Sequence, residues 1–438
     1  MFTPPRFIVI DDDLNHLEAI ATTIQALGSV CARVHYTPEK DAPKELFAAA
    51  RAIFIDLQLQ DRSASSDFNR HFAEIQRILG KFIQPTNGPY ILVLWTDEAG
   101  RVAELQSYLE TNLFASTPHT KPIAIVPLSK TDYIDIGTGE QTAGDLVEDI
   151  RKHLSAQPAM NALVQWEAEV LSAATRVLSD ITTLTTELDG DAPLPTLLKR
   201  LAVEAVGHAN AADDPRASVH AAFLPLLQDH LQNASEVNDE WSRAFESATE
   251  PAPALSKAQV SMLNTKLHIT QPDKVREISP VAWGAVCEPE ANFDWNEFGL
   301  DDETAYMEQI LAKGVRIDLA KYKASVAQIR IGAACDYAQK AVGPIPYALA
   351  ALLPVKEGEK SHELNPKSTG WVSPELDLGK GIVQIFVDPR FVRVRGAKTA
   401  ASFNALGRIK EQLLLELVSV VSHHSSRPGI VRFKATAR

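Results

Sequence analysis

The chain has 438 residues, of which 45% are hydrophobic and 23% are charged, and its formal net charge is −13. This length allows two or three domains with cores of their own, and the composition is ordinary for a soluble globular protein. The negative charge argues against a general nucleic-acid coat protein, and three widely spaced cysteines exclude a disulfide framework and fit a reducing compartment.

Residues 1–157 alternate between strand and helix patterns. Apolar runs predict strands at 7–10, 30–36, 52–55, 90–95 and 123–126. Amphipathic segments predict helices at 13–27, 38–50, 99–111 and 143–154, and a further helix that ends at about residue 80. Alternating strands and helices are typical of a doubly wound parallel sheet, so we expect a five-stranded α/β domain.

Residues 158–250 have a different character, because helical patterns follow one another without a strand between them. Helices are predicted at 161–188, 194–208, 218–232 and 238–247, which indicates a helical linker or bundle. The proline-containing stretch 250–255 is expected to be a hinge.

Residues 256–438 are predicted to form a mixed α+β output domain. Helices are expected at 257–267, 301–312 and 400–421. Short β-like runs at 325–331, 347–355, 381–387, 391–394 and 430–433 favour an antiparallel sheet or a small barrel.

Polar residues follow the predicted strands of the first domain at the points where a parallel sheet binds its ligands. Asp11 and Asp12 follow the first strand, Asp56 the third, Thr96 the fourth and Lys130 the fifth. A carboxylate can accept a phosphoryl group as an acyl phosphate, and the charge involved requires a hard cation with oxygen ligands. We therefore expect Asp11, Asp12 and Asp56 to bind Mg²⁺, with Lys130 and Thr96 contacting phosphoryl oxygens.

The segments FIVIDDDLNHLEAI, AIFIDL, ILVLWT and VPLSK resemble the receiver domain of two-component response regulators. The resemblance covers about one third of the chain. It implies that Asp11 and Asp12 bind the metal, that Asp56 is the phosphoacceptor, that Thr96 is the switch hydroxyl and that Lys130 pairs with the phosphate. Asp13 is expected only to cap the following helix.

Several positions depart from the receiver pattern. Asp97 stands where receivers usually have a small residue, Gln60 where a proline often follows the acceptor loop, and Thr131 where a proline usually follows the lysine. An additional carboxylate at Asp97 would repel an incoming phosphate and compete for the metal. These departures leave two interpretations open, a phosphorylated receiver and an atypical receiver that binds a partner at the same pocket.

The C-terminal segment IRIGAACDYAQ resembles, loosely, output modules that accompany divergent receivers in bacterial conflict and phage-defence operons. Cys335 could be a nucleophile with His423 or His424 as its base, or these residues could join Asp336 in a metal site. The structural alternative is that Cys335 is a small buried apolar residue and that Asp336 caps a helix. No Walker loop, GGDEF-like run or HExxH motif is present, so no enzyme class is assigned.

The predicted function is signal reception. A cytoplasmic location is expected because no signal peptide or membrane span is recognised. A sensor histidine kinase or another phosphodonor would act on the receiver, and the output domain would act by protein–protein contact, in a bacterial antiviral defence operon. One alternative is a nucleic-acid-binding regulator, since residues 390–438 contain ten Lys or Arg against two Glu. Another is a hydrolase that uses Cys335. Homodimerisation is expected through residues 98–111 and 144–154.

Overall fold

The computed structural model describes residues 4–26, 28–38, 41–59, 68–135, 145–186, 193–233, 239–248, 253–272, 277–290, 292–333, 336–337, 343–379 and 381–426. By its internal contacts the chain divides into two compact units. The first comprises residues 1–178 and 227–250, and the second comprises 179–226 and 251–438. The predicted helical segment 158–250 therefore contributes to both units.

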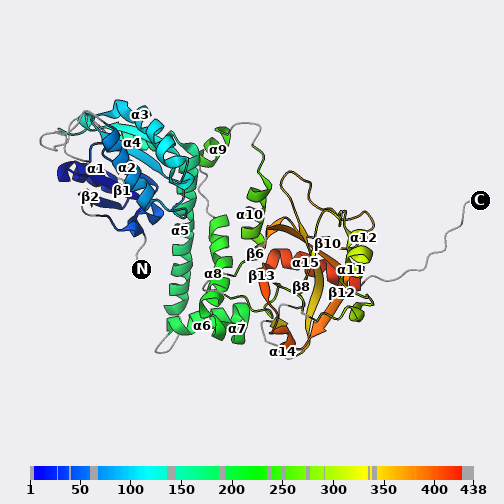
Figure 1. The fold of residues 1–438 in the computed structure, drawn as a ribbon. Coiled ribbons are helices and arrows are strands. Elements are labelled where there is room, and N and C mark those ends of the chain that lie inside the picture. Colours follow the sequence, from blue (N-terminus) through cyan, green and yellow to red (C-terminus); the bar gives the residue numbers. More distant parts are fainter. Residues whose placement is uncertain are drawn as a thin grey trace, which may run out of the picture. The chain divides into compact units, whose positions relative to one another are not determined.

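The first unit contains a five-stranded sheet in the order β2-β1-β3-β4-β5. Figure 1 labels two of its strands, β1 and β2, and the helices α1 to α4 around them. Every neighbouring pair of strands runs parallel. The strands are β1 (Phe7–Asp11), β2 (Cys31–His35), β3 (Ala52–Ile55), β4 (Ile91–Thr96) and β5 (Ala124–Ser129). Strands β3 and β4 are buried on both faces, which explains their continuous apolar runs. The order reverses between β1 and β3, and sheets of this kind bind ligands beside such a reversal.

Helices cover both faces of this sheet. On one face, α2 (Asn69–Phe82) and α3 (Val102–Leu109) pack against β1, β3 and β4 in one apolar cluster. On the other face, α1 (Leu14–Ala26) and α4 (Leu146–Ser155) pack against the alternate residues of the same strands. This arrangement is the predicted doubly wound α/β domain.

The helix predicted at 38–50 is wrong in type and length, because among the described residues 38 and 41–50 only Lys44–Ala49 are helical, as a 3-10 helix. Pro43 immediately precedes that helix. Proline lacks a backbone N–H and disfavours the helical conformation of the residue before it, so a helix could not run through Ala42 and Pro43.

The four predicted helices of residues 158–250 are confirmed, with shifted ends. They are α5 (Pro158–Thr186), α6 (Pro193–Val206), α8 (Pro215–Gln232) and α9 (Asp239–Glu246), and a short helix that was not predicted, α7 (His208–Asp213), lies between α6 and α8. At the N-terminal part of α5, Met160 is buried in the same apolar cluster as α1 and α4. The first helical residues of α5 are thus part of the core of the α/β domain.

Two arginines attach α5 to the amino-terminal edge of the sheet. Arg51, which directly precedes β3, donates two hydrogen bonds of 2.8 Å to the carboxylate of Glu167 on α5. Arg6, which directly precedes β1, also donates to Glu167. These side chains are partly buried, so the contacts are more than surface ion pairs.

The second unit contains an eight-stranded antiparallel sheet, as predicted for the C-terminal region. The strand order is β10-β12-β9-β8-β7-β13-β6, and β11 also pairs with β12. The strands are β6 (Ile269–Thr270), β7 (Ala285–Cys287), β8 (Ser325–Arg330), β9 (Ile345–Pro354), β10 (Trp371–Val372), β11 (Leu376–Asp377), β12 (Ile382–Arg395) and β13 (Ala405–Ile409). The two runs predicted at 381–387 and 391–394 are one strand with an irregular register between Val387 and Val392.

Helices flank this sheet as well. The helix α15 (Glu411–Ser425) packs its apolar residues on one face, and α11 (Glu303–Tyr306), a π-helical turn (Met307–Leu311) and α12 (Ala312–Gly314) pack on the other. α10 (Lys257–His268) starts with a capping box at Ser256. In the described ranges, no helix combines the length and apolar character needed to cross a bilayer.

The predicted helix 400–421 is wrong in its first half. Only α14 (Ala397–Ala400) and α15 are helical there, and β13 lies between them. Residues of β13 pair with β6 and β7, so a tertiary sheet contact overrides the local helical pattern. The strand predicted at 430–433 lies outside the described residues.

Candidate functional site

The structure brings the predicted acids together at the carboxyl ends of two adjacent strands. Asp11 is the last residue of β1, Asp12 follows it, and Asp56 follows β3. One carboxylate oxygen from each lies within 4.8 Å of the others. Asp11 and Asp56 are buried, whereas Asp12 is exposed. The three acids therefore form a set of oxygen ligands in which Asp11 and Asp56 are covered by the protein and Asp12 is accessible from solvent.

The turn between β1 and α1 fixes the orientation of this cluster. Asp13 Oδ1 accepts hydrogen bonds from the backbone N–H groups of Asn15 and His16, at 2.8 and 3.3 Å, and so caps α1 as expected. Although burial opposes ionisation, these N–H groups lower the pKa of Asp13. The backbone N–H of Asp13 in turn donates to Asp11 Oδ1 at 2.9 Å. The chain thus uses Asp13 for structure and leaves its two neighbours for the cluster.

Lys130 lies between the two buried acids. It begins a short 3-10 helix after β5 and has no exposed surface. Its Nζ donates to Asp11 Oδ2 at 2.9 Å and to Asp56 Oδ2 at 2.8 Å. Burial opposes the charge of Lys130, but the two carboxylates raise its pKa, so the side chain is an ammonium.

The single positive charge of Lys130 does not neutralise the three carboxylates of Asp11, Asp12 and Asp56. Burial raises the pKa of Asp11 to about 7, Lys130 acts against this rise, and the neighbouring Asp56 adds to it. A second cation would relieve the repulsion between the carboxylates, and an all-oxygen donor set suits a hard divalent ion. The residues present therefore fit the predicted Mg²⁺ site.

Thr96 ends β4, the strand next to β3, and is fully buried. Its Oγ1 accepts a hydrogen bond of 3.2 Å from the backbone N–H of Glu98. Asp97, next in the chain, is exposed and does not belong to the group of three acids. Gln60 lies outside the described residues.

Sequence reasoning missed two buried histidines beside the acids. His16 on α1 is 3% exposed, and its Nδ1 lies 3.3 Å from Lys130 Nζ. His71 on α2 is buried, and burial lowers its pKa while the charge of Asp56 acts in the opposite direction. Neither position carries a signal in the sequence, because each is a single histidine within an amphipathic helix.

The C-terminal candidate residues are not brought into a described site. Cys335 lies outside the described residues, and Asp336 is exposed. His423 and His424 lie in the last turn of α15. The proposed cysteine–histidine pairing therefore stays a prediction.

Several basic residues of the 390–438 segment already have partners within the fold. Arg390 pairs with Asp388. Arg395 contacts Glu290 and Glu297, at 3.0 and 2.8 Å, and the buried Arg393 lies near the same two carboxylates. Residues 427–438 lie outside the described part, so the nucleic-acid prediction for this segment stays a prediction.

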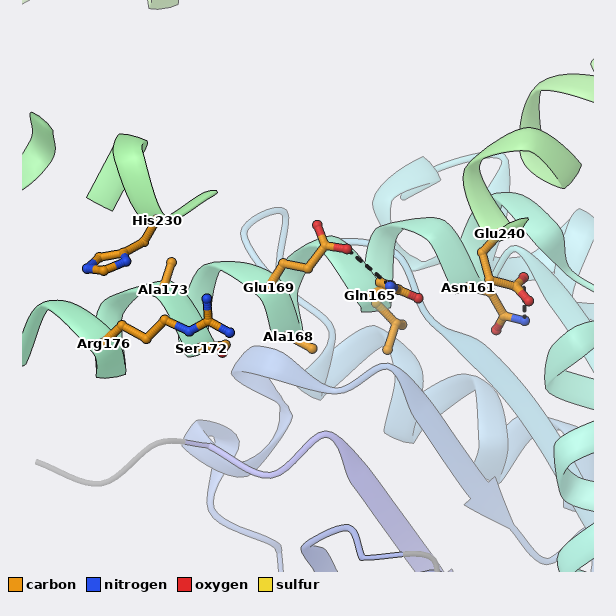
Figure 2. A pocket seen from close by; sticks show the side chains of 10 residues that line it. Asn161, Gln165, Ala168, Glu169, Ser172, Ala173, Arg176, His230 and Glu240 are labelled. Atoms are coloured by element: carbon orange, nitrogen blue, oxygen red, sulfur yellow. Dashed lines mark hydrogen bonds between the residues drawn. The ribbon is translucent and has the colours of Figure 1, made fainter. Parts of the chain in front are cut away.

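A groove of about 540 Å³ runs along α5 (Figure 2). It is lined by polar side chains such as Gln165, Glu169 and Arg176 of α5, with His230 and Glu240 from α8 and α9. Gln165 donates to Glu169 at 3.1 Å, so part of this lining is internally satisfied. None of the groove residues belongs to the acidic cluster, which makes the two sites separate features of the first unit.

Comparison of the chain with protein-family models and with curated proteins finds no match. The acidic cluster in a doubly wound domain is therefore the main ground for a functional assignment.

Proposed function

We propose that the first unit is a receiver-like signalling domain that accepts a phosphoryl group on Asp56. The observation that carries this proposal is the buried contact of Lys130 with both Asp11 and Asp56 at the carboxyl ends of adjacent strands. Such a lysine is suited to pair with an oxygen of a phosphoryl group attached to either acid. The resemblance of the surrounding motifs to response-regulator receivers supports the same assignment.

Asp11, Asp12 and Asp56 would hold the Mg²⁺ ion in this proposal. The bound ion would neutralise negative charge on the transferring phosphoryl group. Burial of Asp11 and Asp56 keeps their oxygens in place before the donor arrives, and the exposed Asp12 offers an entry side.

In the transfer step, an oxygen of the Asp56 carboxylate attacks the phosphorus atom of the donor. The bond from phosphorus to the donor's nitrogen or oxygen breaks, and the donor's atom keeps the electron pair, so that acetyl phosphate, for example, releases acetate. Lys130 donates an N–H to a phosphoryl oxygen, and the hydroxyl of Thr96 turns from the end of β4 to donate to another. The displacement of Thr96 would change the surface near α3 and shift the population of conformations.

Asp56 is only 1% exposed and is held by Lys130, which favours a second candidate function. A closed acceptor suits a domain that docks a partner protein without phosphotransfer. In either case we propose that the second unit acts by protein–protein contact, in the setting of bacterial defence. Nucleic-acid binding through 390–438 and hydrolysis by Cys335 are rival proposals for that unit.

The deciding experiment is the intact mass of the full chain after incubation with Mg²⁺ and acetyl phosphate. We expect one phosphate adduct on the wild type and on Asp97→Asn, and none on Asp56→Asn or without Mg²⁺. Circular dichroism establishes that each variant is folded. A folded wild type without an adduct would reject phosphotransfer and favour the docking function.

A further inference from the structure

The ammonium group of Lys130 has three acceptors around it. They are Asp56 Oδ2 at 2.8 Å, Asp11 Oδ2 at 2.9 Å and His16 Nδ1 at 3.3 Å. An ammonium has three N–H donors and no lone pair. Each donor therefore has one acceptor, and one of the three acceptors is an uncharged group from α1.

The contact with Lys130 fixes the protonation state of His16. Because the ammonium can only donate, Nδ1 of His16 must carry its lone pair, so the ring proton is on Nε2. A doubly protonated imidazole would point its Nδ1–H at the ammonium, which has no lone pair to accept it. His16 is therefore a neutral hydrogen-bond acceptor that α1 contributes to Lys130.

Packing alone does not explain a histidine at this position. The neighbouring buried residues of α1, such as Leu17 and Ile20, are apolar and fill the core below the sheet. A buried polar ring costs free energy unless its polar atoms are hydrogen-bonded. The histidine is located at the start of α1, where the backbone N–H of His16 is itself held by the Asp13 cap.

We propose that His16 is a positioning residue for Lys130, an inference that rests on the proposed function of the acidic cluster. A lysine side chain has four rotatable bonds and must be restrained to point at one place. With one N–H anchored on His16, the ammonium stays between Asp11 and Asp56. It can then redirect another N–H to a phosphoryl oxygen on Asp56 without leaving the pocket.

The first test is nitrogen NMR of the metal-free full chain with labelled histidine. The His16 signals are assigned from their loss in His16→Asn. At neutral pH we expect a protonated Nε2 and an unprotonated Nδ1. A proton on Nδ1 would overturn the proposal, and this measurement does not depend on any phosphotransfer.

The second test compares two variants by adduct lifetime on Asp56 in Mg²⁺ and acetyl phosphate. His16→Asn places an amide oxygen near the position of Nδ1, whereas His16→Leu has similar bulk and no acceptor. Loss of a hydrogen bond to a charged group should shorten the adduct lifetime about tenfold in His16→Leu, and His16→Asn should retain most of it. Equal lifetimes in His16→Leu and the wild type would overturn the proposal. If the wild type takes up no phosphate, the proposed function fails, and the NMR result alone decides the role of His16.

Discussion

Arg51 holds Glu167 through two hydrogen bonds of 2.8 Å, and it does so at the end of β3 opposite to Asp56. Arg6 and Asp11 stand in the same relation at the two ends of β1. The two strands that carry the acidic cluster at their carboxyl ends thus carry the attachment of α5 at their amino ends. A shift of either strand on ligand binding would therefore also displace the arginine that holds Glu167 of α5.

Glu167→Gln should loosen α5 from the sheet. The substitution removes a charge-assisted contact with two partly buried arginines, so we expect a loss of about 1–3 kcal/mol in the free energy of unfolding. Hydrogen exchange should become faster over the first turns of α5. Glu169→Gln on the same helix is the control, because Glu169 contacts Gln165 and not the arginines. Equal exchange in both variants would contradict the attachment.

Lys130→Met should destabilise the first unit by about 3–5 kcal/mol, because it leaves two buried carboxylates without their cation. Mg²⁺ should restore part of this loss by binding the folded state. Urea unfolding with and without Mg²⁺ measures both effects. Lys81→Met, which removes a half-exposed ion pair with Asp41, should cost less than about 1 kcal/mol and show no such dependence on Mg²⁺. A Lys130→Met protein that is indifferent to Mg²⁺ would speak against the metal site.

The raised pKa of Asp11 predicts how stability changes with pH in the absence of metal. Burial raises this pKa from 3.8 to about 7 on folding. Between these values the folded state binds more protons than the unfolded state, so its stability falls as the pH rises. Asp11→Asn should remove this contribution and flatten the profile between about pH 4 and pH 7. Urea unfolding in EDTA across this range is the measurement, and parallel profiles would show that Asp11 titrates normally.

Gly284→Ala should destabilise the second unit strongly. Gly284 has a φ of +85°, and an added Cβ would lie 2.5 Å from the carbonyl oxygen of Ile409. This close approach is where the backbones of β7 and β13 meet, with Ile409 donating to the Gly284 carbonyl at 2.9 Å. We expect the free energy of unfolding to fall by about 2–4 kcal/mol, because the steric clash and the backbone strain act together.

Gly299→Ala is the matched control for this prediction. Gly299 also has a positive φ, of +67°, but an added Cβ would meet no atom within 4 Å. The free energy of unfolding should fall by only about 1–2 kcal/mol, which is the cost of a non-glycine residue at a positive φ. Thermal unfolding compares the two variants, and equal losses would mean that the contact with Ile409 is unimportant.

Much of the α/β domain could be predicted from sequence because its strands are short apolar runs between helical patterns. The convergence of Asp11, Asp12 and Asp56 followed from the same logic, since parallel strands direct their carboxyl ends to one edge. The segment 38–50 has the apolar spacing of an α-helix, but Pro43 interrupts it, so that a 3-10 helix forms at Lys44–Ala49.

Other features depend on contacts between distant residues and could not be predicted. β13 has a helical apolar pattern and becomes a strand only because β7 and β6 lie beside it. His16 and Lys130 are separated by 114 positions, so nothing in the α1 segment alone identifies the histidine as a hydrogen-bond partner. The attachment of Glu167 to Arg6 and Arg51 likewise links residues more than one hundred positions apart.

The burial of Met160 and the arginine contacts of Glu167 also determine where the protein can be divided for biochemistry. A fragment that stopped at residue 157 would lack an apolar side chain from the core of the sheet domain and would leave Arg6 and Arg51 without their carboxylate. Such a fragment should be prone to aggregation and poorly folded. A soluble fragment that carries the acidic cluster should extend along α5 beyond Glu167.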